Sequence, residues 1–291
     1  DVERSRGLGD VYKRQAYTYE NNRWVGHDII VKNEGNVWKG TFTPANKTGF
    51  MAFKFVADTI VDNNNGQTFG VMLNKEDGRP WPGGYAAWGL LRSQKYGHYI
   101  PDYIDFTKTK EVNDTIVYYW MNNEITYNPS SSIAYAPFFA SSARAAKIEG
   151  TESRIDKAVK FLKKQGTEEA LMNAMDIVYN NMTEVEAIKA TILKKYPKGL
   201  IAMKTKFDEK FDYRDPKATE KHYIDFITAF PYTVERDNYL QKFGQSYDNV
   251  YTTLMIIDSM NGKTDKQNEY LNKLSFFGCI NIFYKLIEIS H

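Results

Sequence analysis

Three aromatic residues, Trp81, Tyr85 and Trp88, lie close together in a stretch of the chain that is rich in glycine and proline. Flat rings of this kind stack on the faces of sugars and on the side chains of peptides. The pattern predicts a loop, and on one interpretation it presents an aromatic platform, with these three residues as the candidate ligand-binding site. Because large aromatic side chains usually serve burial, we favour the other interpretation, a loop that folds back and closes the edge of the sandwich with its aromatic side chains.

Catalytic and metal-binding patterns are missing from the sequence. The four histidines have no i, i+4 or HExxH spacing that would hold a metal on a helix, and no GxSxG, Walker or GxGxxG motif occurs. The single cysteine, Cys279, has apolar neighbours, a setting that keeps a thiol protonated and inert. We therefore predict no catalytic residue, no metal ligand and no cofactor in this chain.

Length and composition set further bounds. The 291 residues and 42% apolar content suffice for two domains, each with its own core. The 38 basic and 36 acidic residues leave a net charge of only +2, so the chain lacks the excess of basic residues that is typical of nucleic-acid-binding proteins. No apolar run reaches the length that spans a membrane. One cysteine excludes an internal disulfide and a Cys-x-x-Cys redox pair within the chain.

The first fifteen residues, 1–15, form a polar leader, DVERSRGLGDVYKRQ, which lacks an initial methionine and the apolar core of a secretory signal. The leader resembles translated adapter sequence, and we exclude it from the expected fold. A disordered basic tail is the alternative. On the first interpretation the true N-terminus is not visible, so the lack of a signal peptide says nothing about the compartment. The other end, at His291, is also expected to be a cut end.

The first part of the chain alternates apolar and polar residues with a period of two, as in strands buried on one side. The pattern is clearest over residues 37–43 and 50–56, with further candidates at 28–32 and 68–73. Turn residues such as Asn65-Gly66 separate these short strands. This spacing predicts an antiparallel, Ig-like β-sandwich over residues 16–128.

After a predicted linker at residues 128–132, the apolar period changes to 3.6 residues, which indicates helices. Thr183 and Asp215-Pro216 are expected to begin helices, and Gly166 is expected to end one. Apolar positions recur every 34 residues at Leu162, Tyr196 and Phe230. A helical repeat of this length resembles the tetratricopeptide repeat, and an irregular bundle with a chance period is the alternative. The expected fold is α+β in two parts, with an all-α, tetratricopeptide-like array over residues 129–291.

Several stretches resemble a known family. Residues 50–59, 84–90, 193–199 and 281–289 are similar to the N-terminal half of extracytoplasmic TlpA-like, thioredoxin-family disulfide reductases of gram-negative bacteria. The resemblance implies that a sandwich and a helical region precede a thioredoxin domain, which carries the catalytic Cys-x-x-Cys. This chain stops before such a domain, and Cys279 does not fit the motif. No catalytic residue is carried over.

The resemblance implies a non-catalytic accessory region of a thiol–disulfide oxidoreductase in the periplasm or cell envelope, with envelope proteins as substrates or partners. Two alternatives stay open. One is a glycan-binding module that uses the aromatic loop, supported by a weaker similarity of residues 22–24 and 36–40 to sugar-binding modules found ahead of amylase domains. The other is a protein-binding helical scaffold with no enzyme attached.

Overall fold

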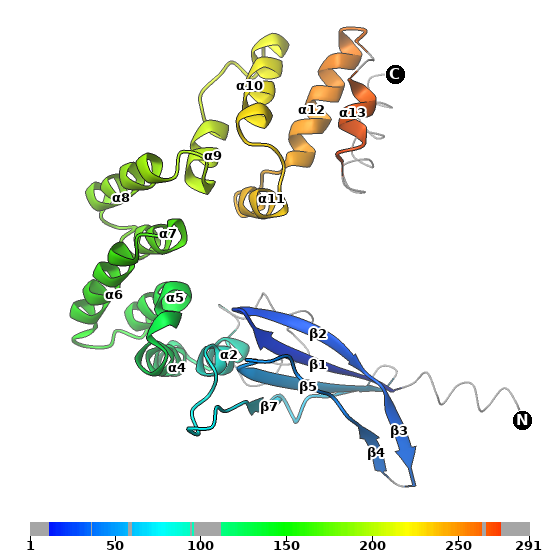
Figure 1. Ribbon diagram of the computed structural model, residues 1–291, viewed down its shortest axis with the longest axis vertical. Coiled ribbons are helices and arrows are strands. Elements are labelled where there is room, and N and C mark those ends of the chain that lie inside the picture. The colour runs from blue at the N-terminus through cyan, green and yellow to red at the C-terminus, as the bar shows by residue number, and fades with distance from the viewer. Residues whose placement is uncertain are drawn as a thin grey trace, which may run out of the picture. The chain divides into compact units, whose positions relative to one another are not determined.

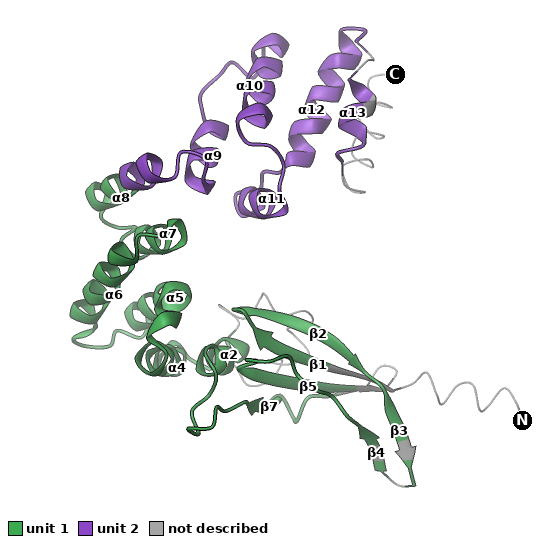
Figure 2. Ribbon diagram, viewed as in Figure 1, with its two compact units in different colours: residues 1–188 green, residues 189–291 purple. Residues whose placement is uncertain are grey.

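The computed structural model describes residues 12–35, 37–57, 60–93, 95, 112–263 and 266–274 (Figure 1). A small antiparallel sheet region is followed by helices, so the predicted α+β class is confirmed at this level. The chain divides into two compact units, residues 1–188 and 189–291 (Figure 2). The division falls within a helix and not at the predicted linker near residue 128.

Five strands form the main sheet. They are β1 (Tyr12–Glu20), β2 (Arg23–Ile29), β5 (Phe50–Ala57), β6 (Ile60–Asp62) and β7 (Phe69–Met72). β1 lies between β2 and β5, and β5 pairs with both β6 and β7, always antiparallel. A separate hairpin joins β3 (Val31–Glu34) to β4 (Val37–Gly40). The predicted strands at 50–56 and 68–73 are therefore present, whereas residues 41–43 are outside any strand.

The β1–β2 hairpin turns at Asn21 and Asn22, which have φ angles of +49° and +62°. Asparagine tolerates this left-handed region, which a two-residue hairpin turn requires. β1 begins at Tyr12, and Tyr12 pairs with Ala57. The last four residues of the leader thus belong to the sheet, contrary to their exclusion from the fold, because backbone pairing with β5 does not need the apolar alternation that they lack. Residues 1–11 lie outside the described residues.

A helix covers one face of the central strand. Phe50 of β5 packs on Trp88 of α2 (Gly84–Leu91), with ring centroids 5.5 Å apart. A Cβ atom at Gly70 of β7 would lie 2.9 Å from the Trp88 ring, so the glycine allows this close approach. The Ig-like arrangement of the strands stays a prediction.

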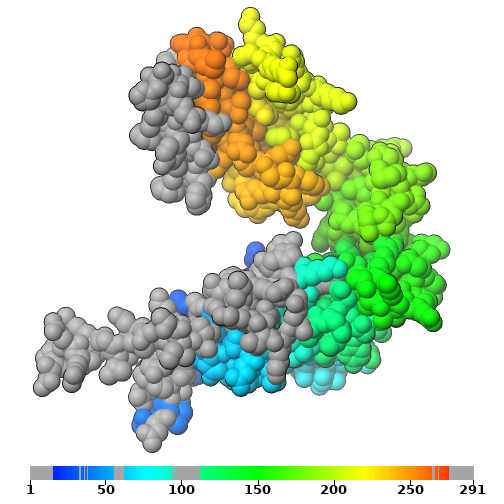
Figure 3. Space-filling model, turned by 180° about the vertical axis from the view of Figure 1, so that it is seen from behind, coloured from blue at the N-terminus to red at the C-terminus, as the bar shows by residue number. Residues whose placement is uncertain are grey.

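Unit 1 also contains the helices α4 (Asp114–Tyr127), α5 (Ser132–Ala145), α6 (Thr151–Gln165) and α7 (Glu168–Ile177). In the space-filling view, the cyan and green residues of α2 to α7 form one continuous packed surface (Figure 3). The sequence pattern placed strands as far as Trp120, and the structure has α4 there. The side chain of Asn113 caps this helix by accepting a hydrogen bond from the Ile116 N–H.

The predicted linker is a packed junction. Residues Pro129–Ser131 form a single 3-10 turn, η1, between α4 and α5. Asn128 is 95% buried, since only 5% of its surface is exposed, and its side-chain amide donates a hydrogen bond to Glu124. The Pro-Ser-Ser sequence therefore forms a tight helical turn and not a free linker, and the division into domains at residues 16–128 and 129–291 stays a prediction.

α8 (Met182–Lys195) leads from unit 1 into unit 2, which continues with α9 (Leu200–Phe207), α10 (Pro216–Ala229), α11 (Val234–Gln241), α12 (Tyr247–Met260) and α13 (Gln267–Leu271). Asp215 caps α10 with Pro216 at its first position, and Gly166 ends α6 at φ +62°, both as predicted. The prediction for α8 was wrong. Its cap is Asn181, whose Oδ1 accepts a hydrogen bond from the Glu184 N–H, and not Thr183.

Two consecutive helix pairs repeat at a constant interval. α8 and α10 begin at residues 182 and 216, and α9 and α11 begin at 200 and 234, so both steps are 34 residues (216 − 182 and 234 − 200). The corresponding ends, 195 and 229, and 207 and 241, differ by the same number. Ile192 and Phe226, which are 34 residues apart, are both fully buried. This repeated position therefore lies on the packed side of both helices, whereas Tyr196 is only half-buried where Phe230 is buried.

Candidate functional site

The three predicted site residues lie at the beginning of α2 and along it, and each is half-buried. Trp81 precedes the helix, and its backbone N–H donates a 2.9 Å hydrogen bond to the carbonyl oxygen of Leu73. Tyr85 and Trp88 follow within the helix, one turn apart. The segment that the sequence pattern assigned to a loop is therefore largely helical.

Trp88 contacts partners on the sheet side of α2. Besides Phe50, the guanidinium carbon of Arg92 lies 4.1 Å from its ring centroid. Burial lowers the pKa of Arg92, and its Nε atom is buried without a hydrogen-bond partner. A cation this close to an aromatic face is held by the ring quadrupole. Trp88 thus serves packing between the helix and the sheet.

Tyr85 faces α4 instead. Its ring stacks on Trp120 with centroids 6.0 Å apart and planes at 23°, and it lies 5.9 Å from the ring of Tyr127. Burial raises the pKa of the Tyr85 hydroxyl, and the neighbouring Tyr127 raises it further. Tyr119 meets Trp120 edge to face at 5.1 Å. Arg79 lies over Tyr127, 5.4 Å from its centroid.

We call this group the α2–α4 aromatic surface; it consists of Arg79, Tyr85, Tyr119, Trp120 and Tyr127. Tyr119 is 55% exposed and Tyr127 is 46% exposed, so the group is accessible to a ligand. Among the described residues, no recorded ring contact joins Trp81 or Trp88 to it. The structure therefore combines one predicted site residue, Tyr85, with four that the sequence analysis did not identify.

A buried carboxylate fixes the start of α2 against α4. Glu124 is fully buried, and its two oxygens accept hydrogen bonds from the backbone N–H groups of Gly83 at 2.9 Å and Ala86 at 3.2 Å. Asn128 donates a third hydrogen bond at 3.0 Å. A negative charge at a helix N-terminus is stabilised by the unpaired N–H groups and the helix dipole. Glu124 therefore caps α2 where Gly83 has no side chain to do so.

Gly89 lets the two helices approach closely. A Cβ atom at this position would lie 2.8 Å from the Cβ of Trp120 and 3.1 Å from the Cε of Met121. Real Cβ atoms do not tolerate the shorter distance, so a larger residue would push α4 away from α2. The glycine is thus part of what places Trp120 beside Tyr85.

A buried hydroxyl cluster joins the first hairpin to α5. The Tyr135 Oη atom lies 3.0 Å from the Tyr19 Oη and 2.7 Å from the Asn22 Oδ1. Burial raises the pKa of Tyr19 to about 12 and raises that of Tyr135 well above its ordinary value. Both phenols are therefore neutral near pH 7, and the cluster has the properties of a structural hydrogen-bond network.

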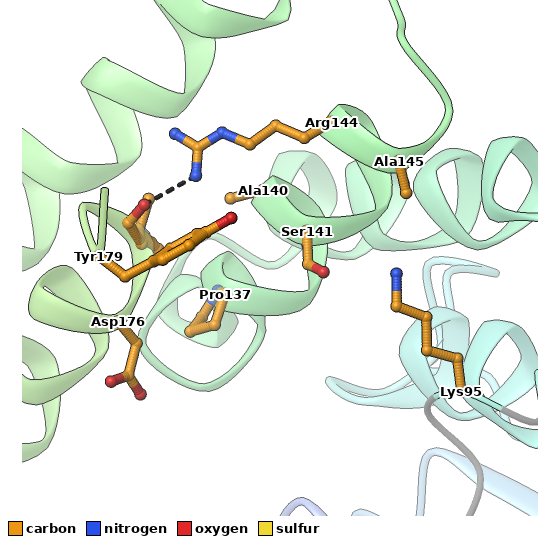
Figure 4. Close-up of a pocket in the computed structure, with 9 residues that line it drawn as sticks. Lys95, Pro137, Ala140, Ser141, Arg144, Ala145, Asp176 and Tyr179 are labelled. Carbon is orange, nitrogen blue, oxygen red and sulfur yellow. Dashed lines mark hydrogen bonds between the residues drawn. The ribbon is translucent and has the colours of Figure 1, made fainter. Parts of the chain in front are cut away.

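A cavity of about 360 Å³ lies beside α5 and α7 (Figure 4). Arg144 donates hydrogen bonds to the carbonyl oxygen of Ile177 at 2.8 Å and to Glu152 at 3.3 Å. Lys95, on the other side of the cavity in Figure 4, lies 3.7 Å from Asp114. The volume is in the range of small-molecule sites. However, the two cationic side chains that line it, Arg144 and Lys95, already pair with carboxylates of the protein, those of Glu152 and Asp114.

No group of three or more His, Cys, Asp and Glu side chains in the described part of the chain is arranged to hold a metal ion. Over the same residues, no helix is long and apolar enough to cross a bilayer. Cys279, His98 and His291 lie outside the residues that the structure describes.

A signal for the missed residues was present in the sequence. Asn113 followed by Asp114 is a typical helix start, and Ile116, Trp120 and Tyr127 then recur at helical spacing. Comparison with protein-family models, curated proteins and solved structures gave no match to this chain. The interpretation of the site therefore depends on its geometry alone.

Proposed function

We propose that this chain is the non-catalytic N-terminal accessory region of a cell-envelope thiol–disulfide oxidoreductase, with a binding and spacing role. The observation that carries the proposal is the constant 34-residue step from α8–α9 to α10–α11. Paired helices that repeat at this interval stack on their neighbours and present extended surfaces to partners. On this proposal the helices from α6 onward are a tetratricopeptide-like array.

We also propose that the strands correspond to the Ig-like sandwich of such proteins. Short antiparallel strands support this assignment, since β1 pairs with both β2 and β5. Two of the stretches that carry the family resemblance lie in regular elements, since residues 50–57 form β5 and residues 84–90 lie in α2. Residues 281–289 lie outside the described residues.

The proposed role is binding because disulfide reduction needs chemistry that one cysteine does not provide. A thiolate attacks the substrate disulfide, and a second thiol then resolves the mixed disulfide. The chain has only Cys279. Electrons would come from a neighbouring thioredoxin domain in the periplasm or envelope. This region would hold the substrate protein or set the distance between that substrate and the thioredoxin domain.

Two measurements test the proposal. The purified chain, mixed with insulin and dithiothreitol, should give no faster reduction of insulin disulfides than dithiothreitol alone. The coding sequence that follows residue 291 should contain a Cys-x-x-Cys motif within roughly one domain length, about 150 codons. Turnover by the purified chain, or a following domain without that motif, would contradict the proposal.

A binding scaffold without an attached enzyme is the second candidate, and the accessible α2–α4 aromatic surface is the observation that favours it. The glycan-binding alternative predicts heat on titration with polysaccharides that is lost in Trp81→Ala and Trp88→Ala. Because Trp88 is engaged by Phe50 and Arg92, its substitution is expected to affect stability more than any ligand binding.

A further inference from the structure

We propose that the α2–α4 aromatic surface is a docking site for an extended peptide segment of a partner protein, one that carries a carboxylate beside proline or aromatic side chains. The inference deepens the binding role proposed above and rests on it only for the idea that the chain holds a partner. The peptide measurement below and the insulin assay read different properties, so either can fail without the other.

The composition of α4 separates this surface from an ordinary solvated helix face. The helix has two charged residues, Asp114 and Glu124, and the second is fully buried. Of its exposed positions, Ile116, Tyr119 and Tyr127 are apolar or aromatic, with exposures of 37%, 55% and 46%, and the other two, Thr115 and Thr126, carry no charge. Protein interfaces are distinguished by depletion of charge and enrichment of tyrosine, tryptophan and arginine. All three enriched types occur here.

The rings form one continuous row. From Tyr119 through Trp120 and Tyr85 to Tyr127, successive centroids are 5.1, 6.0 and 5.9 Å apart. Each ring is supported by its neighbour, so ordering the surface on binding costs little side-chain entropy. A row of this kind fits an extended chain, such as a polyproline II segment, better than it fits a single inserted side chain.

The charge at one end of the row defines the partner further. The Arg79 guanidinium lies over Tyr127, and no ion pair to it is recorded within the described residues. Its backbone N–H binds the side chain of Asp77, 2.9 Å away, but that contact leaves the guanidinium donors available. A planar guanidinium recognises carboxylates through paired hydrogen bonds. The complementary ligand therefore has an acidic group next to its apolar rings.

The ring geometry favours a peptide over a sugar. Tyr85 and Trp120 stack on each other at 23°, so each ring gives part of a face to its neighbour. Sugar binding needs a free, flat face, whereas peptide side chains can also pack along ring edges. Binding of an oligosaccharide at this surface is accordingly an outcome that would overturn the proposal.

The test starts from a random peptide library displayed on phage and selected on the full chain, with the double variant Arg79→Ala/Tyr127→Ala as the counter-selection target. Peptides enriched on the wild type alone are expected to carry Asp or Glu adjacent to Pro, Phe, Tyr or Trp. No enrichment over the double variant, or enrichment of basic peptides, would overturn the proposal.

The most enriched peptide is then titrated by calorimetry. Arg79→Ala and Tyr127→Ala should each weaken its binding roughly tenfold or more, because arginine and tyrosine are among the residues that carry most of the binding energy of an interface. Arg214→Ala and Tyr179→Ala are matched controls, since Arg214 also lies over an aromatic ring, that of Tyr213, and Tyr179 is 61% exposed, and neither is part of the α2–α4 aromatic surface. Circular dichroism confirms folding of each variant. Unchanged affinity in the first pair, equal losses in the controls, or heat with cello- or xylo-oligosaccharides instead would refute the proposal.

Discussion

The Oε1 atom of Glu124 lies 2.9 Å from the backbone nitrogen of Gly83, although 41 residues separate the two in the sequence. This hydrogen bond joins the last turn of α4 to the N-cap residue of α2 inside the core. Because the carboxylate is fully buried, water cannot replace it. The contact therefore fixes the position of Tyr85, which follows Gly83 by two residues and forms the centre of the α2–α4 aromatic surface.

Glu124→Gln should destabilise unit 1 while preserving side-chain size. An amide has only one acceptor oxygen, so its NH₂ group would face one of the N–H donors that now bind the carboxylate. A buried donor left without an acceptor costs about 1–3 kcal/mol. The free energy of unfolding, measured by urea titration with circular dichroism, should fall by this amount. The control is Glu152→Gln, whose side chain is 68% exposed; equal midpoints for the two variants would contradict the assignment.

Gly89→Ala should disturb the contact between α2 and α4. The new Cβ would meet the Cβ of Trp120 at 2.8 Å, and relief of that overlap requires a backbone shift. Overpacking of this kind typically costs about 1–3 kcal/mol, and the near-ultraviolet circular dichroism of the displaced Tyr85–Trp120 stack should weaken. In Gly26→Ala, the control, the nearest atom is 3.5 Å away, an ordinary contact. A full-strength aromatic signal in Gly89→Ala would show that the glycine is not needed.

The sequence predicted correctly those parts of the fold that depend on residues close together in the chain, such as strand alternation and helix caps. Residues 50–56 alternate as a strand buried in the sheet centre, and they form β5. Asp215-Pro216 begins α10 because an acceptor side chain and a preset φ angle suit the first turn of any helix. The 34-residue spacing was visible because the same apolar positions recur in each helix pair.

Tertiary contacts determined what the sequence analysis missed. Gly83, Gly84 and Gly89 suggested a loop, but their role is close approach, since a Cβ at Gly84 would lie 2.7 Å from the carbonyl oxygen of Gly49. In α4 the buried stripe of Val117 and Met121 continues into Glu124, and a charged residue there conceals the helical period. Tyr85 was identified because it lies between two tryptophans in a stretch rich in glycine and proline. Its partner Trp120 is distant in the sequence and comes next to Tyr85 only in the folded chain.

Alkaline pH should unfold the first hairpin region in a defined range. The pKa of Tyr19 is raised from 10.0 to about 12 by burial. A raised folded-state pKa means that the neutral phenol is favoured in the native state, so its stabilising effect is fully present below about pH 10 and is lost as the pH rises through 12. Tyrosinate absorbance should therefore show an early phase from exposed tyrosines and a later phase that coincides with loss of circular dichroism. A single phase near pH 10 with the fold intact would contradict burial of the Tyr19–Tyr135 pair.

Phe230→Ala should destabilise unit 2 strongly. The side chain is 5% exposed, and its ring centroid lies 6.2 Å from that of Phe226. The backbone carbonyl oxygen of Phe230 accepts a 2.7 Å hydrogen bond from the Tyr247 hydroxyl. Truncation of a buried phenylalanine leaves a cavity and costs about 3–5 kcal/mol. Calorimetry should show a lower melting temperature for the transition assigned to unit 2 by hydrogen exchange. Tyr232→Ala, at an aromatic position that is 50% exposed, should lower it much less. Equal losses in the two variants would contradict the buried position of Phe230.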